Sequence, residues 1–146
     1  MLVKKRGNSI IFSENQGENG NYMLEEVEQI QKKGYPGANV WNIQKQKFCK
    51  NPDLIIANLV AEKIGLQNLI KIVKESRAKY ISVLIWDKRN KKCLSIFMGE
   101  KGVYHSVTEE EVISAFQENW LDPIYMKDGI EVEGVFFIRL DFRVLR

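Results

Sequence analysis

The sequence predicts an α+β fold: one domain over residues 1–146, with an antiparallel sheet of about five or six strands and three or four helices packed mainly on one face. Two observations predict the sheet, namely the apolar run Tyr80–Trp86 and the strict alternation of apolar residues at 135–144. A third, helical spacing of large apolar residues after Thr108, predicts a helix packed against it. The composition, 45% hydrophobic and 28% charged, excludes disordered and collagen-like chains.

The first third of the chain predicts a strand, a helix and a short strand. Asn8–Ser13 is the strand, and the polar, glycine-containing stretch 14–21 that follows predicts a surface loop. Tyr22–Lys33 has apolar residues at three-residue spacing, acidic residues early and lysines late, as in a helix. A short strand or irregular segment is expected at Ala38–Ile43.

The segment from Asn51 to Ala78 predicts one long broken helix or two short ones. Asn51 is suited to the cap and Pro52 to the first helical position. Apolar residues then recur at helical spacing on both sides of Gly65, where a break is expected.

An antiparallel meander is predicted next. Its strands are Tyr80–Trp86, Cys93–Met98 and Val103–Val107, with a basic turn at 87–92 between the first two. The apolar character of Tyr80–Trp86 predicts a central strand covered on both faces.

Thr108 and Glu111 form a predicted capping box at the start of a helix. Trp120 lies on the apolar stripe of that helix and is expected in the core. A small hairpin is predicted from Ile124–Met126 and Ile130–Glu133, before the final alternating strand.

Several classes of function are excluded by what the sequence lacks. Its longest uninterrupted apolar runs are too short for a membrane span or for the core of a signal peptide, so a cytoplasmic protein is expected. Cys49 and Cys93 have no neighbouring ligands and are expected to be unpaired thiols, so no metal is predicted. Neither GxxxxGK[ST] nor GxGxxG occurs, and no cofactor is predicted.

The single histidine offers a weak catalytic hypothesis. As a general base His105 requires a partner, and Cys93 or Tyr104 would supply it if the second and third meander strands pair. A histidine on a half-buried strand face explains the same residue without catalysis, and we favour that interpretation. A metal-independent enzyme around His105 is therefore the third-ranked hypothesis.

A second hypothesis is nucleic-acid binding through the basic turn. Lys88, Arg89, Lys91 and Lys92 would contact phosphates, with Trp41 and Trp86 as stacking platforms. The opposing interpretation is a solvated hairpin tip, because residues 102–146 carry a net charge of −5 and would repel nucleic acid.

The first-ranked hypothesis is a small protein-binding module. Trp41 lies in a polar segment, as is typical of interface anchors, and with Tyr35 and Tyr22 it is the first candidate surface for a protein partner. Phe137, on the polar side of the last strand, is the second candidate. Residues 1–101 carry +8 against −5 in the remainder, which suits electrostatic recognition. The sequence thus favours a stoichiometric inhibitor of bacterial or phage origin, of the toxin-immunity or counter-defence type, that covers the functional site of an unknown protein partner. Self-association through a sheet edge stays open.

Overall fold

The computed structural model describes residues 8–12, 37–40, 54–98 and 104–145. In chain order its elements are β1 (Asn8–Phe12), β2 (Gly37–Val40), β3 (Leu54–Asn58), α2 (Val60–Ile64), α3 (Leu66–Ser76), β4 (Tyr80–Trp86), α4 (Leu94–Met98), α5 (Glu109–Glu118), β5 (Leu121–Val132) and β6 (Val135–Val144). The predicted helix Tyr22–Lys33 lies outside the described residues, whereas the predicted strand at Asn8–Ser13 is confirmed as β1.

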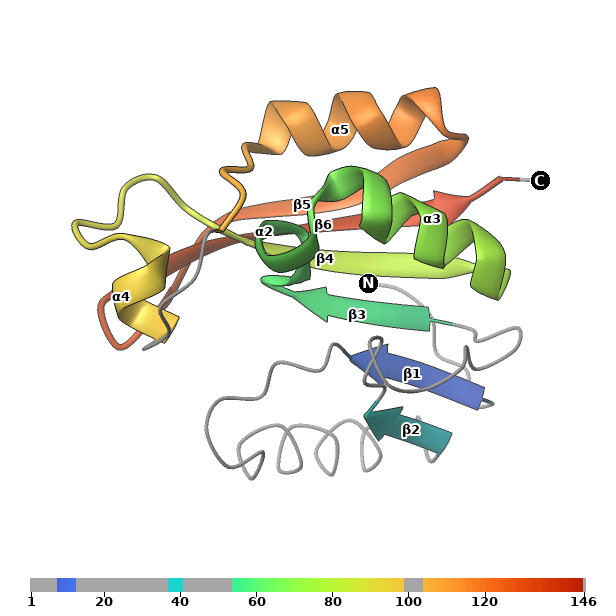
Figure 1. The fold of residues 1–146 in the computed structure, drawn as a ribbon, viewed down its shortest axis with the longest axis horizontal. Helices are drawn as coiled ribbons and strands as arrows, with labels where there is room; N and C mark the ends of the chain where they lie inside the picture. Colours follow the sequence, from blue (N-terminus) through green and yellow to red (C-terminus); the bar gives the residue numbers. More distant parts are fainter. Residues whose placement is uncertain (1–7, 13–36, 41–53, 99–103, 146) are drawn as a thin grey trace.

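The predicted antiparallel α+β fold is wrong, because the strands form one mixed sheet in the order β2-β1-β3-β4-β6-β5 (Figure 1). β1 to β4 run parallel to one another. β6 lies antiparallel between β4 and β5. The parallel strands therefore share one edge at which all their carboxyl ends meet.

The largest correction concerns β3, which the sequence analysis assigned to a helix. Its residues Leu54 to Ala57 are apolar at four consecutive positions, and β3 pairs in parallel with β4 from Leu54↔Tyr80 to Asn58↔Leu84. A short apolar run is compatible with either a buried helix or a buried parallel strand. Pairing with a neighbour on each side decides for the strand, since it satisfies every backbone group inside the core.

After β3 the chain forms two short helices, the second of the two predicted alternatives. Leu59 turns the chain with a φ of 62°, α2 follows at once, and Gly65 separates α2 from α3 with a φ of 89°. Glycine adopts positive φ without the penalty that a Cβ brings, so the break falls where the sequence places this residue.

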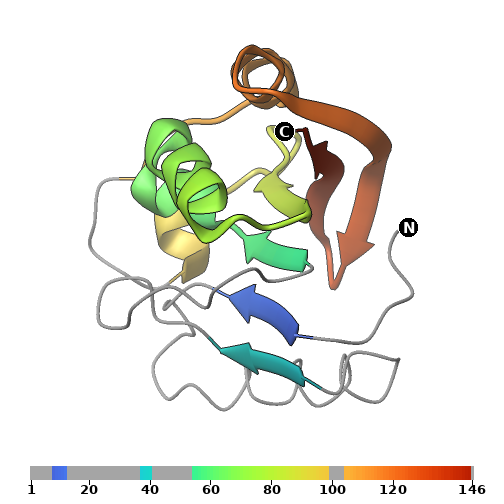
Figure 2. The same cartoon turned by 90° about the vertical axis from the view of Figure 1, so that its right-hand side faces the viewer.

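The main core lies between one face of the sheet and the helices α2, α3 and α5, which cover that face together (Figures 1 and 2). Ile81, Val83 and Ile85 of β4 point into it with no exposed surface. Phe116 of α5 stacks on Phe142 of β6 with ring centroids 4.5 Å apart. Burial of these large apolar side chains is the main stabilising contribution to such a fold.

The predicted meander is also wrong. Leu94–Met98 is helix α4 and residues 104–108 contain no strand, so the partner of β4 is the distant β6. The turn after β4 holds to β6 instead, because Asn90 donates to the Phe136 carbonyl at 2.8 Å and accepts from the Phe136 N–H at 2.8 Å. These two bonds satisfy the backbone of Phe136, which lies one residue beyond Trp86↔Phe137, the last pair between β4 and β6.

The end of the chain forms one long hairpin. The predicted small hairpin is wrong, since residues 121–132 are the single strand β5, joined to β6 through a turn at Glu133 and Gly134. The capping box at Thr108 is confirmed, with both reciprocal bonds formed. Trp120 is not in the core: it follows the end of α5 with a φ of 67° and is 69% exposed.

Candidate functional site

A cavity of about 590 Å³ lies at the carboxyl end of β4. One wall is the chain from Ile85 to Arg89, and a second is the start of α4 at Cys93–Ser95. The segment 104–110, which leads into α5, closes a third side. In α/β sheets, ligands bind outside the carboxyl ends of the strands, so the cavity occupies the expected place for a functional site.

Glu62 is the most unusual residue in the cavity wall. It is 2% exposed, and its Oε2 accepts a hydrogen bond of 2.7 Å from the backbone N–H of Trp86. No donor among the described residues reaches its Oε1. Burial raises the pKa of this carboxyl to about 7, against the opposing effect of the Trp86 N–H. A carboxyl group with such a pKa exchanges a proton near neutral pH.

His105 lies beside Glu62 but is not on a strand, contrary to the expected strand face. Its backbone N–H donates to the Glu62 carbonyl at 2.7 Å, which fixes the segment 104–108 to α2. Its imidazole covers Gly65, where an added Cβ would lie 3.4 Å from Cε1. His105 is exposed and lines the cavity.

Cys93 and Tyr104 line the same cavity as His105, so the three weak catalytic candidates are brought together, although no pairing of strands does so. The Cys93 thiol is exposed and 3.3 Å from the Ser95 hydroxyl. This contact, with the Ile96 N–H, lowers the pKa of the Cys93 thiol. Cys49, the other expected free thiol, lies outside the described residues.

Asp87, Arg89 and Asp128 form an ionic network at the rim. Asp87 is buried and accepts from the Arg89 backbone N–H at 2.8 Å and from the Arg89 Nε at 3.0 Å. The same guanidinium contacts Asp128 of β5 at 2.5 Å. Hydrogen bonding to Arg89 lowers the pKa of Asp87 despite its burial. The network thus ties the loop after β4 to the distant hairpin.

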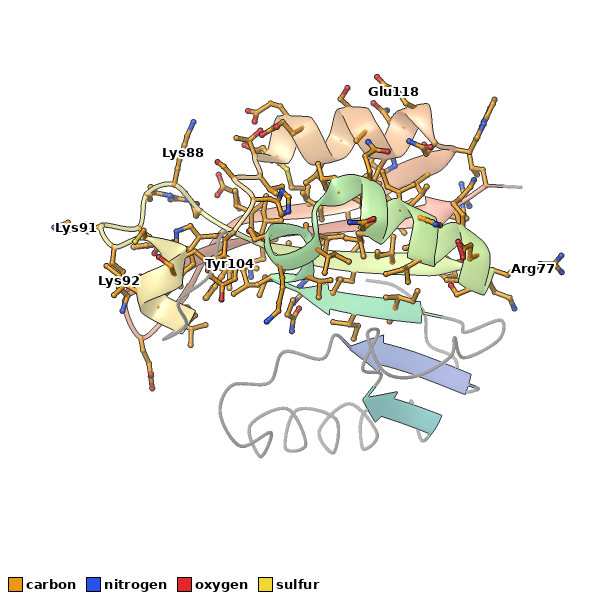
Figure 3. The ribbon with its side chains drawn as sticks, viewed as in Figure 1. Arg77, Lys88, Lys91, Lys92, Tyr104 and Glu118 are labelled. Atoms are coloured by element: carbon orange, nitrogen blue, oxygen red, sulfur yellow. The ribbon has the colours of Figure 1, made fainter. Side chains whose placement is uncertain are left out.

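The basic residues of the nucleic-acid hypothesis do not share one role. Lys88, Lys91 and Lys92 are exposed, and Figure 3 shows them extending away from the sheet at one end of the molecule. The ammonium of Lys92 lies 5.4 Å from the Phe97 ring centroid. Arg89 is engaged by Asp87 and Asp128, and Trp86 is half-buried with its ring 5.0 Å from that of Phe97. Their contact with nucleic acid stays a prediction.

The predicted partner surface is altered at Phe137. This side chain is 8% exposed and packs edge-on against Trp86, with centroids 6.1 Å apart, so it is no surface anchor. β6 lies between β4 and β5, and the Phe97 ring of α4 lies 6.2 Å from the Phe137 ring. Alternation alone reveals neither relationship. Trp41, Tyr35 and Tyr22 lie outside the described residues.

Glu62 was missed by the sequence analysis, which assigned Glu62 and Lys63 to an ordinary helix. The signal in the sequence was that an acidic residue, Glu62, directly follows the apolar run Leu59-Val60-Ala61, which itself comes after a buried segment. Among the described residues no group of three His, Cys, Asp or Glu side chains is placed to hold a metal ion. In the same part of the chain, no helix has the length and apolar character needed to cross a membrane.

Comparison with known proteins identifies the fold. No family model and no curated protein matches the sequence. Among solved structures, an S-adenosylmethionine-dependent methyltransferase from Methanosarcina mazei is similar with a TM-score of 0.60 at 12% identity, over 99% of this chain and 94% of that chain. Geranyl diphosphate C-methyltransferase from Streptomyces coelicolor gives 0.57 at 10% identity, over 94% and 71%. Magnesium protoporphyrin IX methyltransferase from Synechocystis gives 0.55 at 10% identity, over 95% and 71%.

These similarities overturn the first-ranked hypothesis of a protein-binding inhibitor. That hypothesis depended on the absence of a catalytic signature, on a long polar loop and on the opposite net charges of the two ends of the chain. The chain instead has the Rossmann-like α/β fold of the S-adenosylmethionine-dependent methyltransferases.

Proposed function

We propose that the protein is an S-adenosylmethionine-dependent methyltransferase. The observation that carries the proposal is the sheet order, with antiparallel β6 inserted between β4 and β5, in a chain that matches solved methyltransferases over nearly its whole length. A cavity at the carboxyl end of the central strand adds a place for the acceptor substrate. Since fold alone does not define function, the site must supply the remaining argument.

The cofactor is expected where the strand order reverses. β1 has β2 on one side and β3 on the other, so the carboxyl ends of β1 and β3, at Phe12 and Asn58, mark the switch point of the sheet. The glycine-containing stretch 14–21 comes directly after β1 in the sequence, and its composition predicts a surface loop. This order of strand and glycine-containing turn is typical of nucleotide-binding α/β folds.

The charge of the cavity at the carboxyl end of β4 also suits such a cofactor. Five carboxyl groups line it, from Glu62, Asp87, Glu109, Glu110 and Asp128, against two cations, Lys88 and Arg89. S-adenosylmethionine, when bound, supplies a methyl group on a positively charged sulfur. An acidic lining in a partly desolvated space favours that cation over its neutral product.

Calorimetric titration with S-adenosylmethionine and with S-adenosylhomocysteine tests the proposal. We expect saturable binding of both at one site per chain. Hydrogen exchange on the same complexes should show protection at residues 54–62, where β3 ends and α2 begins, and none in the turn between β5 and β6. Absence of binding, or protection confined to the β5–β6 hairpin, would contradict the proposed function.

A further inference from the structure

Glu62, one of the residues that line the cavity, has a carboxylate oxygen without a hydrogen-bond partner among the described residues. Glu62 Oε1 is buried, and no donor among the described residues reaches it, while Oε2 is occupied by the Trp86 N–H. Leaving such a group unpaired is costly, because a buried acceptor has lost its water. An unpaired acceptor in a cavity wall is therefore suited to a donor that arrives with a ligand.

The other lining residues restrict what that ligand is. Apolar wall is supplied by Ile85, Leu94, Val107 and Ile138, which suits a hydrocarbon or aromatic body. Asp87 is already neutralised by Arg89. Glu109 and Glu110, at the start of α5, form no ion pair with Lys88 among the contacts of the described residues. The remaining charge is acidic, so a cationic group is favoured over an anionic one.

We propose that the cavity binds the methyl-accepting substrate through a basic amine on an apolar body, and that the Glu62 carboxylate pairs with its ammonium group and takes up the proton. The inference rests on the proposed function, and it names the substrate class for the same site. Glu62 would be a catalytic residue, since its Oε1 contacts the reacting nitrogen.

The proton transfer is balanced without a further reactant. One N–H proton of the ammonium group passes to Glu62 Oε1, which leaves a neutral amine with a lone pair. That lone pair forms the new N–C bond as the S–C bond of the sulfonium donor breaks, with its electron pair passing to sulfur. The positive charge thereby moves from sulfur to the methylated nitrogen, and the proton leaves Glu62 to solvent afterwards.

The state of Glu62 before binding agrees with this role. With burial raising its pKa to about 7, the carboxyl is largely protonated at pH 6 and largely ionised at pH 8.5. An ammonium ion that pairs with it at pH 6 must expel the carboxyl proton. The other titratable groups facing this space are Asp87, Lys88 and Arg89 after β4, and Cys93 before α4. Tyr104, His105, Glu109 and Glu110 face it from the segment leading into α5, and Asp128 from β5.

The test is calorimetric titration of the full chain with benzylamine, without any methyl donor, in two buffers that differ in ionisation enthalpy. At pH 6 we expect release of close to one proton per bound amine, and at pH 8.5 close to none. Benzyl alcohol has nearly the same shape without the charge, and it should bind at least tenfold more weakly at pH 8.5. Glu62→Gln, which keeps an oxygen for the Trp86 N–H, should abolish the proton release. Glu118→Gln, on the exposed surface of α5 and outside the cavity lining, should retain it.

Three results would overturn the inference: no benzylamine binding, equal affinity for benzylamine and benzyl alcohol, or proton release that persists in Glu62→Gln. The last would assign the released proton to another group that lines the cavity. The titrations with benzylamine and with benzyl alcohol both use the unaltered chain, so they decide the question even if Glu62→Gln fails to fold. Cofactor binding without amine binding would leave the proposed function standing and remove only this inference.

Discussion

The Trp86 backbone N–H donates a hydrogen bond of 2.7 Å to Glu62 Oε2, which joins the last residue of β4 to α2. Through the Glu62 carbonyl, the same residue also accepts from the His105 N–H at 2.7 Å. Glu62 therefore connects three segments that are distant in sequence, and it does so at the wall of the cavity. Any change in its charge affects the stability of the fold as well as the chemistry of the site.

We expect Glu62→Gln to remove a pH dependence of stability. The pKa of Glu62 is raised in the folded chain from 4.5 to about 7, so the folded state binds the extra proton. The contribution of Glu62 to the free energy of unfolding is fully present below pH 4.5 and is lost as the pH rises to about 7. The difference in free energy of unfolding between wild type and Glu62→Gln should change by about 3 kcal/mol over that interval. Urea unfolding at several pH values measures it.

Comparison with the variant is necessary because burial also raises the pKa of Asp141, which contributes a dependence of the same sign. That contribution is common to both proteins and cancels in their difference. A difference that does not vary between pH 4 and 8 would show that Glu62 is not perturbed.

Asp87→Asn should destabilise the protein more than Asp128→Asn. Asp87 is buried and accepts both a backbone and a guanidinium donor from Arg89, so its loss should cost about 1–3 kcal/mol. Asp128 and Arg89 are both about half exposed, so solvent screens their pair and the loss of Asp128 should cost less. Since Arg89 lowers the pKa of Asp87, stability from Asp87 is present above its unfolded pKa and is lost as pH falls. Thermal unfolding of both variants at pH 7 and pH 3 tests the order, which equal losses at pH 7 would contradict.

Gly65→Ala and Gly134→Ala form a matched pair for the junction between α2 and α3. Both glycines have positive φ, 89° and 81°, so each substitution strains the backbone. Gly65 also has a ψ of 154°, a combination essentially limited to glycine, so Gly65→Ala should cost about 1–3 kcal/mol from the backbone. At Gly65 the new Cβ would also lie 3.4 Å from the His105 ring, whereas Gly134 has no atom within 4 Å among the described residues. Gly65→Ala should therefore also shift the His105 ring resonances in NMR spectra. Unchanged His105 signals would show that the ring does not cover Gly65.

The parts of the fold that the sequence predicted are those determined by local chemistry. Thr108 and Glu111 specify a helix start through bonds three residues apart, and the structure forms both. Alternation likewise predicted β6, because a two-residue period needs no knowledge of the partner strand. The burial of Phe137 could not be predicted in this way, since it depends on α4 and Trp86.

The parallel sheet was missed because its pairing is non-local. β3 has the same apolar residues as a buried helical turn, and only its neighbours β1 and β4 distinguish the two. The cavity shares this dependence: Glu62, Cys93 and His105 come from three segments, which meet only when β4 is central. Once β4 was paired with the wrong strands, no spacing in the sequence could place Glu62 at a site.

Cys93 provides a reporter for the occupied cavity. Its thiol is exposed, and the Ser95 hydroxyl and Ile96 N–H lower the pKa of the thiol, so iodoacetamide should modify it faster than a free cysteine at pH 7. Ser95→Ala removes the largest of these contributions and should slow the reaction. Because Cys93 lines the cavity, saturating benzylamine should also slow it, whereas Trp120→Ala on the exposed end of α5 should leave the rate unchanged. Peptide mass spectrometry over a time course measures the rate at Cys93 alone. A rate that benzylamine does not change would place the amine outside this cavity.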